Sequence, residues 1–443
     1  MSNTVASTFA RNLFAFSRRE IPEEAYDRAR TAIVDTLGVT LAGAVHDGSK
    51  ILREVIVPTA ANGPSRVFGT DLKLNSLDAA LLNGAAAHML DFDDSNSHLH
   101  GHVSVAVLPA LLAAADEKNI NGRKVLHAYI AGFETAARMG NTVSRRQYTL
   151  GWHPTTTVGI FGAVGALAVL LTLSEEETAT AFSLTTSLAS GIKSNFGTMT
   201  KPLIVGHANR NALMAVKLAQ SGFSAGARAF EHHQGFFAVF NGDPSTYDAS
   251  FLTEPWKDEI RLLDRSKGNK QKRFPCCYAI QPPLDGILEL REQHNLTVED
   301  IARVEIGVHP IRYPHINVPE PENPLAAKFA TNYTVARALV AGEVVMEDYE
   351  EDARFNDPAT RALMPLVSLY KYDSDNTGGA AIAIETKDGR RLETFVAAAL
   401  GSTYDYPLPP QAVPEKFIAC ASRAIGKDGA QALLARLEAD DFA

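Results

Sequence analysis

Apolar and polar residues follow a helical period over most of the first 250 residues. After Pro22, the segment EEAYDRARTAIVDTLGVTLAG has acids in its first turn and apolar residues at spacings of three and four, from Ala25 to Leu37. Proline at a helix start and an apolar stripe on one face are both typical of an amphipathic helix. We therefore predict that this part of the chain is a series of helices packed side by side.

Two further segments carry the same signal. Residues 75–90 predict a helix with Ser76 as its N-cap, and Ser174 with Glu177 has the spacing of a capping box, which predicts a helix from there to about residue 190. The segment 155–173 is almost wholly apolar, but glycine and alanine make it small in volume. We expect a buried, closely packed helix there and not a membrane span.

The period changes after about residue 265. Residues 302–310 alternate between apolar and polar side chains, and residues 381–398 form two alternating runs around Asp388-Gly389, a sequence typical of a hairpin turn. Between these strands, residues 279–294 and 332–342 read as helices, and the tail from Pro414 reads as helical again. The second half therefore mixes helices with a small sheet.

These patterns predict a mainly α protein in two parts. A large all-α helical domain is expected to comprise residues 1–264 and 400–443, with the tail packing back on the first helices. A smaller α+β domain, which we call the lid, is expected over residues 265–399. A chain of 443 residues is long enough for two such cores.

Composition excludes several classes of protein. A hydrophobic fraction of 46% with 21% charged residues indicates a soluble globular chain. The net charge is -9 and no basic run is longer than Arg145-Arg146, so we expect no nucleic-acid partner and no membrane partner. The three cysteines, Cys276, Cys277 and Cys420, cannot form a disulfide framework, which suggests a reducing, cytoplasmic location.

The densest ionisable cluster is DFDDSNSHLHGH, residues 91–102. His98, His100 and His102 would share one side of an extended segment and could then supply ligands for a transition metal. Proton chemistry or anion binding by these groups is an equally legitimate interpretation, and so is a polar loop whose side chains only satisfy one another. The residues by themselves leave these three alternatives open.

Helical geometry makes a further prediction for this cluster. If the preceding helix continues, His88, Asp91 and Asp94 lie three residues apart and share one face, whereas Asp93 points elsewhere.

Three other windows contain candidate chemistry. In YTLGWHPTTTVG, His153 lies on the turn before Pro154, where backbone N–H groups could hold a carboxylate, or the histidine is simply part of a helix entry. In NFGTMTKPL, Lys201 lies in a Thr/Gly-rich break between apolar stretches, a position typical of a lysine that faces a cavity. In KQKRFPCCYAI, Lys272 belongs to a basic segment near the domain junction, which is either an anion site or a linker.

Taken together, LDFDDS, GWHPTTTVGIFGA, FGTMTKPL, KRFPCCYA and Tyr313 resemble the MmgE/PrpD family, in order and over nearly the whole chain. The family contains dehydratases, decarboxylases and epimerases of small carboxylates. The resemblance implies a homodimer of subunits with an all-α domain and an α+β lid, an active site between the two domains, and no cofactor or metal. By position it also implies the following site residues: Asp91, Ser95, His102, Tyr148, His153, Lys201, Lys272 and Tyr313.

The resemblance gives these residues roles. Catalytic roles are implied for His102, His153, Lys201, Tyr313, Asp91 and Tyr148, and substrate-binding roles for Lys272, Ser95 and Lys201. The lysines would neutralise a carboxylate, and the histidines and Tyr313 would exchange protons near neutral pH. Asp91 would orient a histidine. Tyr148 matches the epimerase branch of the family.

The function predicted from this resemblance is a cofactor-independent lyase, a dehydratase or decarboxylase acting on a small di- or tricarboxylate by proton abstraction next to a carboxylate. The nearest alternative is an epimerase or isomerase of a dicarboxylate such as iminodisuccinate, using the same proton chemistry. Two alternatives come from other classes of protein. One is a metal-dependent hydrolase built on the three histidines, although the resemblance makes a metal site a weaker hypothesis. The other is a non-catalytic relative that binds carboxylates.

Overall fold

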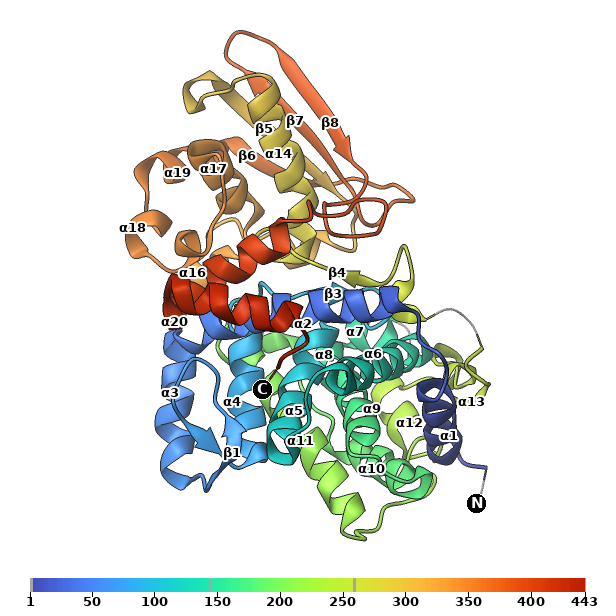
Figure 1. Ribbon diagram of the computed structural model, residues 1–443. Coiled ribbons are helices and arrows are strands. Elements are labelled where there is room, and N and C mark those ends of the chain that lie inside the picture. Colours follow the sequence, from blue (N-terminus) through green and yellow to red (C-terminus); the bar gives the residue numbers. More distant parts are fainter. Residues whose placement is uncertain (1–2, 144, 258–259, 443) are drawn as a thin grey trace. The chain divides into compact units, whose positions relative to one another are not determined.

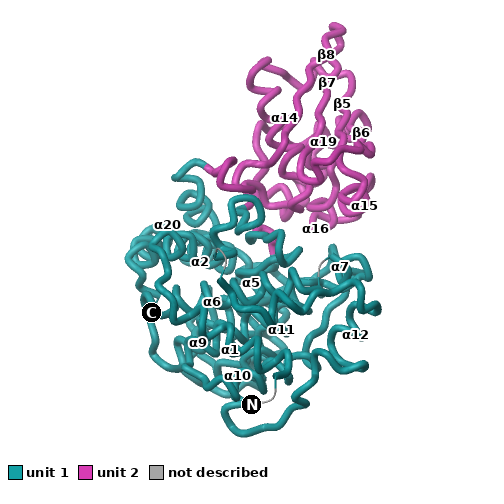
Figure 2. The backbone as a smooth tube through the Cα atoms, turned by 90° about the vertical axis from the view of Figure 1, so that its right-hand side faces the viewer, with its two compact units in different colours: residues 1–89, 93–271, 409–443 teal, residues 90–92, 272–408 magenta. Residues whose placement is uncertain are grey.

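The computed structural model describes residues 3–143, 145–257 and 260–442, which form two compact units. Unit 1 comprises the described residues of 1–89, 93–271 and 409–443, and unit 2 comprises residues 90–92 and 272–408 (Figure 2). The described chain is mostly helical, with a small sheet in its C-terminal part. This confirms the predicted fold class.

Unit 1 is a body of packed helices with two short ribbons of strand. Its helices are α1 (Val5–Ser17), α2 (Glu23–Ala44), α3 (Asp47–Ile56), α4 (Ser76–His88), α5 (Val103–Lys118), α6 (Arg123–Val143), α7 (Arg146–Leu150), α8 (Pro154–Thr157), α9 (Gly159–Leu170), α10 (Glu175–Leu188), α11 (Thr200–Gln220), α12 (Phe236–Asn241), α13 (Ser250–Thr253) and α20 (Ala412–Glu438). Its 3-10 turns are η1 (Val57–Thr59), η2 (Lys193–Asn195), η3 (Pro244–Thr246) and η4 (Arg261–Leu263). The antiparallel ribbons pair β1 (Asn62–Arg66) with β2 (Lys73–Leu74), and β3 (Ser95–Asn96) with β4 (Asn269–Lys270).

The helix starts agree with the sequence patterns in part. Ser174 and Glu177 form the predicted capping box of α10. The predicted cap of α4 was wrong by one residue, because Asn75 and not Ser76 accepts hydrogen bonds from the next free backbone N–H groups. The apolar segment 155–173 contains most of α8 and all of α9, with a break at Val158, and it is buried from Thr155 to Ala168, as expected. In the described chain no helix is both long enough and apolar enough to span a membrane.

The C-terminal helix α20 lies beside α2 near the N-terminal end of the chain (Figure 1). An ion pair fixes this contact, with Lys416 Nζ 2.7 Å from Asp35 Oδ1 and both side chains almost completely buried. Residues from the two ends of the chain therefore complete one helical body.

Helices α4 and α11 approach each other closely because each has a glycine at the contact. A Cβ atom on Gly84 would lie 2.8 Å from Gly206 Cα, and one on Gly206 would lie only 2.2 Å from the backbone oxygen of Leu81. Close backbone approach of this kind requires glycine. The contact matters for function because α4 ends at His88 and α11 begins just before Lys201.

Replacing Gly206 by alanine should force α4 and α11 apart. We expect the free energy of unfolding to fall by about 1–3 kcal/mol, because the clash is with backbone and not with a flexible side chain. Urea denaturation measures this effect. The control is Gly429→Ala in α20, where a Cβ atom meets only the Ile425 side chain at 3.4 Å and should be neutral or stabilising. Equal stability of the Gly206 variant and wild type would contradict the close contact.

Unit 2 is built on a four-stranded sheet in the order β6-β5-β7-β8. The strands are β5 (Ile301–Val308), β6 (Val367–Lys371), β7 (Ala380–Thr386) and β8 (Arg391–Val396). The helices are α14 (Gln281–Gln293), α15 (Tyr313–Ile316), α16 (Pro324–Ala327), α17 (Thr331–Ala341), α18 (Asp352–Phe355) and α19 (Pro358–Leu363), and the 3-10 turns are η5 (Tyr278–Ile280), η6 (Val298–Asp300), η7 (Met346–Tyr349) and η8 (Met364–Leu366). Strand β5 is parallel to β6 and antiparallel to β7.

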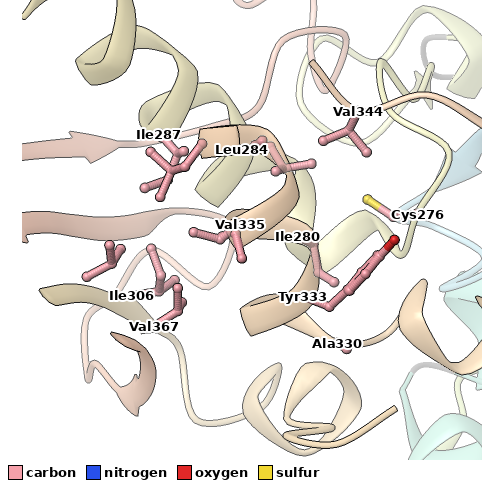
Figure 3. Packing of buried hydrophobic residues seen from close by; sticks show 14 of the residues in the cluster. Cys276, Ile280, Leu284, Ile287, Ile306, Ala330, Tyr333, Val335, Val344 and Val367 are labelled. Atoms are coloured by element: carbon pink, nitrogen blue, oxygen red, sulfur yellow. The ribbon is translucent and has the colours of Figure 1, made fainter. Parts of the chain in front are cut away.

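The core of unit 2 lies between the sheet and helices α14 and α17. Figure 3 shows Leu284 and Ile287 of α14 close to Val335 of α17 and Ile306 of β5, and all four side chains are buried. The predicted hairpin is present as β7 and β8. Its turn spans the four residues 387–390, and Gly389 has a φ of 90°, a backbone conformation that favours glycine.

Candidate active site

Four helix ends of unit 1 carry ionisable side chains into one cluster. His88 is the last residue of α4, His102 precedes α5, His153 precedes α8, and Lys201 is the second residue of α11. Both His102 and His153 have extended backbone at an N-cap position, and neither imidazole caps its helix. Helix ends, which turn the chain sharply, thus place residues from four distant segments near one another.

A buried carboxylate joins two of these imidazoles. Asp93 Oδ1 lies 2.9 Å from His88 Nδ1, and Asp93 Oδ2 lies 2.9 Å from His102 Nδ1. His102 Nδ1 also donates a hydrogen bond of 2.6 Å to the backbone oxygen of Asp94. His88 and Asp93 are fully buried, whereas 14% of the His102 side chain is exposed. The accessible imidazole of the pair is therefore His102.

Burial and charge set the protonation states of this group. Burial lowers the pKa of His88 to about 4, against the opposing effect of the Asp93 charge. Burial would by itself raise the pKa of Asp93, but the neighbouring His88 and His102 hold that pKa well below its usual range. At neutral pH the group is thus an ionised carboxylate beside a neutral His88.

An aromatic ring links the remaining members of the cluster. The ring centroids of His88 and His102 are 4.7 Å apart, and those of His88 and His153 are 5.9 Å apart. The ring of Phe196 lies edge-on to His153 at 4.9 Å, and Lys201 Nζ lies 4.8 Å from the Phe196 centroid. The charge of Lys201 also contributes to the low pKa of His88. The structure therefore brings together three of the residues that the sequence singled out, His102, His153 and Lys201.

A hydrogen-bond network supports the loop between Asp93 and His102. The side chain of Asp94 accepts hydrogen bonds from Ser104 and from Asn269, and the Ser104 hydroxyl is 2.6 Å from the Tyr129 hydroxyl. Burial raises the pKa of Asp94 to about 7. Ser95, another predicted site residue, follows on β3, where it pairs with Lys270 of β4. The loop is thus tied to a distant part of unit 1.

Asp91 does not share a helix face with His88. Helix α4 ends at His88, and Asp91 takes a left-handed φ of 52°. The carboxylate that contacts both imidazoles is Asp93, so the geometric prediction that set Asp93 aside was wrong. The helix had to continue for that prediction to hold, and it stops three residues too early.

Asp91 pairs instead with a lysine of unit 2. Lys272 Nζ lies 3.2 Å from Asp91 Oδ1 and donates to the Asp91 backbone oxygen, and both side chains are buried. Lys328, also buried, donates to the backbone oxygens of Leu90 at 2.6 Å and Pro275 at 3.3 Å. Burial lowers the pKa of Lys328 to about 8, although Asp91 raises it. Two lysines therefore bind residues 90–92 into unit 2.

The two predicted tyrosines lie in different units. Tyr148 belongs to α7 of unit 1, where Lys193 Nζ lies 3.3 Å from its ring centroid and donates to its backbone oxygen. Burial lowers the pKa of Lys193 to about 8. Tyr313 is the first residue of α15 in unit 2, and Lys371 Nζ lies 5.4 Å from its ring centroid. The roles predicted for both tyrosines stay predictions.

The three alternating histidines do not form a single ligand set. His98 contacts Asn141 at 3.1 Å and Asp264 at 3.0 Å, and His100 has a left-handed φ of 55°, so the segment is a turn and not an extended strand. The donor atoms that do lie within 4.8 Å of one another include His88, Asp93 and His102. His88 and Asp93 are hydrogen-bonded, His102 lies at ion-pair distance from Asp93, and the positive charge of Lys201 acts on His88.

Comparison with known proteins identifies the family. The chain matches the MmgE/PrpD N-terminal domain over residues 7–247 and the MmgE/PrpD C-terminal domain over residues 274–439. The chain therefore belongs to the MmgE/PrpD family, which confirms the predicted resemblance.

Several curated relatives match over most of their length. Cis-aconitate decarboxylase from Homo sapiens is 27% identical, covering 98% of this chain and 91% of the relative. Cis-aconitate decarboxylase from Aspergillus terreus is 25% identical, covering 90% and 85%. 2-Methylcitrate dehydratase from Escherichia coli is 26% identical, covering 84% and 80%. Decarboxylases and dehydratases are both lyases, so the prediction of an MmgE/PrpD-type lyase is confirmed at this level.

Sequence reasoning missed three members of the cluster, His88, Asp93 and Phe196. His88 and Asp93 were both visible in the densest ionisable window and its preceding helix, but the assumed helix phase turned Asp93 away. Phe196 lies in the same sequence window as Lys201, five residues before it. Because its side chain is apolar and not ionisable, a search for charged or proton-transferring residues passes over it. Only its contacts with His153 and Lys201 reveal it.

Acidification should destabilise the folded protein through His88. The folded-state pKa of about 4 lies below the ordinary value of 6.5, so the unfolded chain binds a proton that the folded chain excludes. This contribution to stability is present above about pH 6.5 and is lost as pH falls toward about 4, by up to about 3 kcal/mol. Urea titrations of wild type and His88→Asn across this range measure it.

The effect of Asp94 on the pH dependence of stability is opposite to that of His88. The comparison of wild type with His88→Asn corrects for it. Its raised pKa of about 7 means that its contribution is lost as pH rises toward 7. Both proteins retain Asp94, so the difference between them isolates His88. A difference that stays constant with pH would contradict the predicted burial of a neutral His88.

Proposed function

We propose that this protein is a lyase that acts on a small di- or tricarboxylate by removing a proton from, or delivering one to, the carbon next to a carboxylate. The observation that carries the proposal is the cluster of unit 1. His153 and the buried ammonium group of Lys201 contact Phe196, and the rings of His153 and His102 both lie beside His88. A base, an acid and a positive charge are what this chemistry requires.

Lys201 is proposed to bind a substrate carboxylate. A carbon next to a carboxylate loses a proton only if the negative charge that develops is stabilised. Lys201 is 6% exposed, and its ammonium group lies beside the aromatic face of Phe196 and not in bulk water. A charge in such surroundings interacts more strongly with an anion than the same charge at the surface.

His102 and His153 are proposed to move the protons. One imidazole takes the proton from carbon and the other delivers a proton, and Asp93 orients His102 for this exchange. Lys272 and Ser95 retain the substrate-binding roles, and Tyr313, Asp91 and Tyr148 the catalytic roles, that the family resemblance implied. No added cofactor or metal is proposed, because side chains supply the acid, the base and the counter-charge.

Two reactions fit these groups. In a dehydration, the base takes the proton, the electron pair of the C–H bond becomes the new C=C bond, and the hydroxyl group leaves as water after it receives a proton from the acid. In a decarboxylation, the bond to the carboxylate breaks, carbon dioxide leaves, and the carbon that keeps the electron pair receives a proton. The names of the relatives fit both reactions.

A substrate panel tests the proposal. The protein is incubated in deuterated water with 2-methylcitrate, cis-aconitate, citrate and iminodisuccinate, and proton NMR follows each compound. We expect net conversion of at least one of the polycarboxylates, with loss of water or of carbon dioxide. Chelator-treated protein is the control, and activity that requires an added metal ion would favour the hydrolase instead.

Two other outcomes would replace the proposal. Deuterium incorporation without a change in bonding, together with inversion of a stereocentre in iminodisuccinate, would identify an epimerase. Binding of these acids without conversion or exchange would identify a carboxylate-binding relative.

A further inference from the structure

The Asp93 carboxylate lies between two imidazoles, and the proposed function uses only one of them. It accepts a hydrogen bond from His88 on Oδ1, and its Oδ2 atom lies at ion-pair distance from His102. His88 Nδ1 lies 2.9 Å from Oδ1, and His102 Nδ1 lies 2.9 Å from Oδ2. An ionised carboxylate is only an acceptor, so each Nδ1 carries the hydrogen. The backbone oxygen of Asp94, which His102 Nδ1 also contacts, is again only an acceptor. Each neutral ring therefore has its basic lone pair on Nε2.

We propose that His88 is a positioning residue that holds the Asp93 carboxylate and, through it, fixes the orientation and tautomer of His102. The inference rests on the proposed function, in which His102 exchanges a proton with the substrate. His88 itself is fully buried behind His102 and is not proposed to touch the substrate.

The argument starts from the cost of burying Asp93. The carboxylate is completely inaccessible to water, and the hydrogen bond from His88 to Oδ1 offsets part of the cost of burying it. Loss of one donor at a buried acceptor costs about 1–3 kcal/mol, and more for a charged group. Without His88, Asp93 would have to rotate or take up a proton, and either change would alter the partner of His102 Nδ1.

The neutrality of His88 suits this role. Burial keeps the pKa of His88 at about 4, and the nearby charge of Lys201 acts in the same direction. Within the described part of unit 1, the groups that face His88 are Asp93, His102, Lys201 and the ring of His153. A neutral His88 donates a hydrogen bond to Asp93 without adding a positive charge, so the carboxylate keeps its full charge for His102 when that ring is protonated.

Three substitutions distinguish the contributions of the two ring nitrogens of His88. Asparagine places an amide N–H group near the position of Nδ1, so His88→Asn can still donate to Asp93. Glutamine places its amide near the position of Nε2, so His88→Gln loses the Nδ1 donor. His88→Ala removes both. Since Nε2 of His88 is buried and has no hydrogen-bond partner among the described residues, loss of that nitrogen alone should be tolerated.

The first experiment measures kcat and KM against pH with the substrate found in the panel. We expect His88→Ala and His88→Gln to lower kcat by about 10–100-fold with little change in KM, and to displace the acid limb of the kcat/KM profile. His88→Asn should remain within about threefold of wild type. If His88→Asn is as impaired as His88→Ala, or if the alanine variant keeps the wild-type pH profile, the positioning role is wrong.

The second experiment needs no substrate, so it distinguishes failure of this inference from failure of the proposed function. Proton–nitrogen correlation spectra of protein labelled at histidine report which ring nitrogen carries the proton. We expect the Nδ1–H tautomer for His102 in wild type and in His88→Asn, and a mixture or the other tautomer in His88→Gln. An unchanged His102 tautomer in the folded glutamine variant would overturn the inference. Stoichiometric metal in the purified protein, bound through the imidazoles, would overturn it as well.

Discussion

Replacing Lys201 by methionine should lower kcat/KM by about 1000-fold or more, which corresponds to about 4 kcal/mol of transition-state stabilisation. The ammonium group is buried beside Phe196 and is the charged donor proposed to face the substrate carboxylate. Methionine keeps a similar length and volume but carries no charge. Steady-state kinetics and urea denaturation together separate lost chemistry from lost folding.

Lys217→Met is the matched control because it lies on the same helix. Lys217 forms an ion pair of 2.7 Å with Glu117, and both side chains are partly exposed. Such pairs contribute about 0–1 kcal/mol, so activity should be close to that of wild type. A Lys201 variant that folds normally and retains activity within tenfold of wild type would remove Lys201 from the proposed chemistry.

Asp93→Asn should lower kcat by about 1000-fold to about 10000-fold, since the loss of an orienting carboxylate leaves a catalytic histidine in the wrong tautomer. Both His88 and His102 direct Nδ1 at this side chain. An amide offers one oxygen to two donors and turns an N–H group toward the second ring, so one imidazole must give up its tautomer. Steady-state kinetics with the substrate from the panel measures the loss.

Asp264→Asn is the corresponding control. Asp264 also pairs with a histidine, since its Oδ2 atom lies 3.0 Å from His98 Nε2, but neither residue belongs to the cluster around Phe196. We expect little change in kcat for this variant. If both variants lost activity equally, the effect would reflect general disturbance of the loop, and the particular role of Asp93 would be refuted.

Local patterns in the sequence determined the elements of the fold. The helical period after Pro22, the capping box at Ser174 and the alternation on either side of Asp388-Gly389 all correspond to elements of the structure. These signals are reliable because they depend on residues that are near one another in the chain, where backbone hydrogen bonding and side-chain spacing decide the outcome. The same is true of the family resemblance, which depends on short motifs in order.

The candidate site differs from the sequence-based prediction because helix α4 ends earlier than the sequence pattern indicated. Continuing α4 past His88 would place Asp91 beside that histidine, but the chain turns at Asp91 and brings Asp93 there. The choice depends on tertiary contacts, since Lys272 and Lys328 bind the backbone of residues 90–92. A sequence pattern contains no record of such contacts from residues far along the chain.

The sequence by itself determined that the chain is mainly helical and resembles the MmgE/PrpD family, and it predicted His102, His153 and Lys201 among the site residues. Only the tertiary structure decided that these three lie together, that Asp93 lies between His102 and His88, and that Phe196 contacts both His153 and Lys201. The physical reason is that helix packing, through contacts such as Gly84 against Gly206, sets distances between residues that local propensity does not relate.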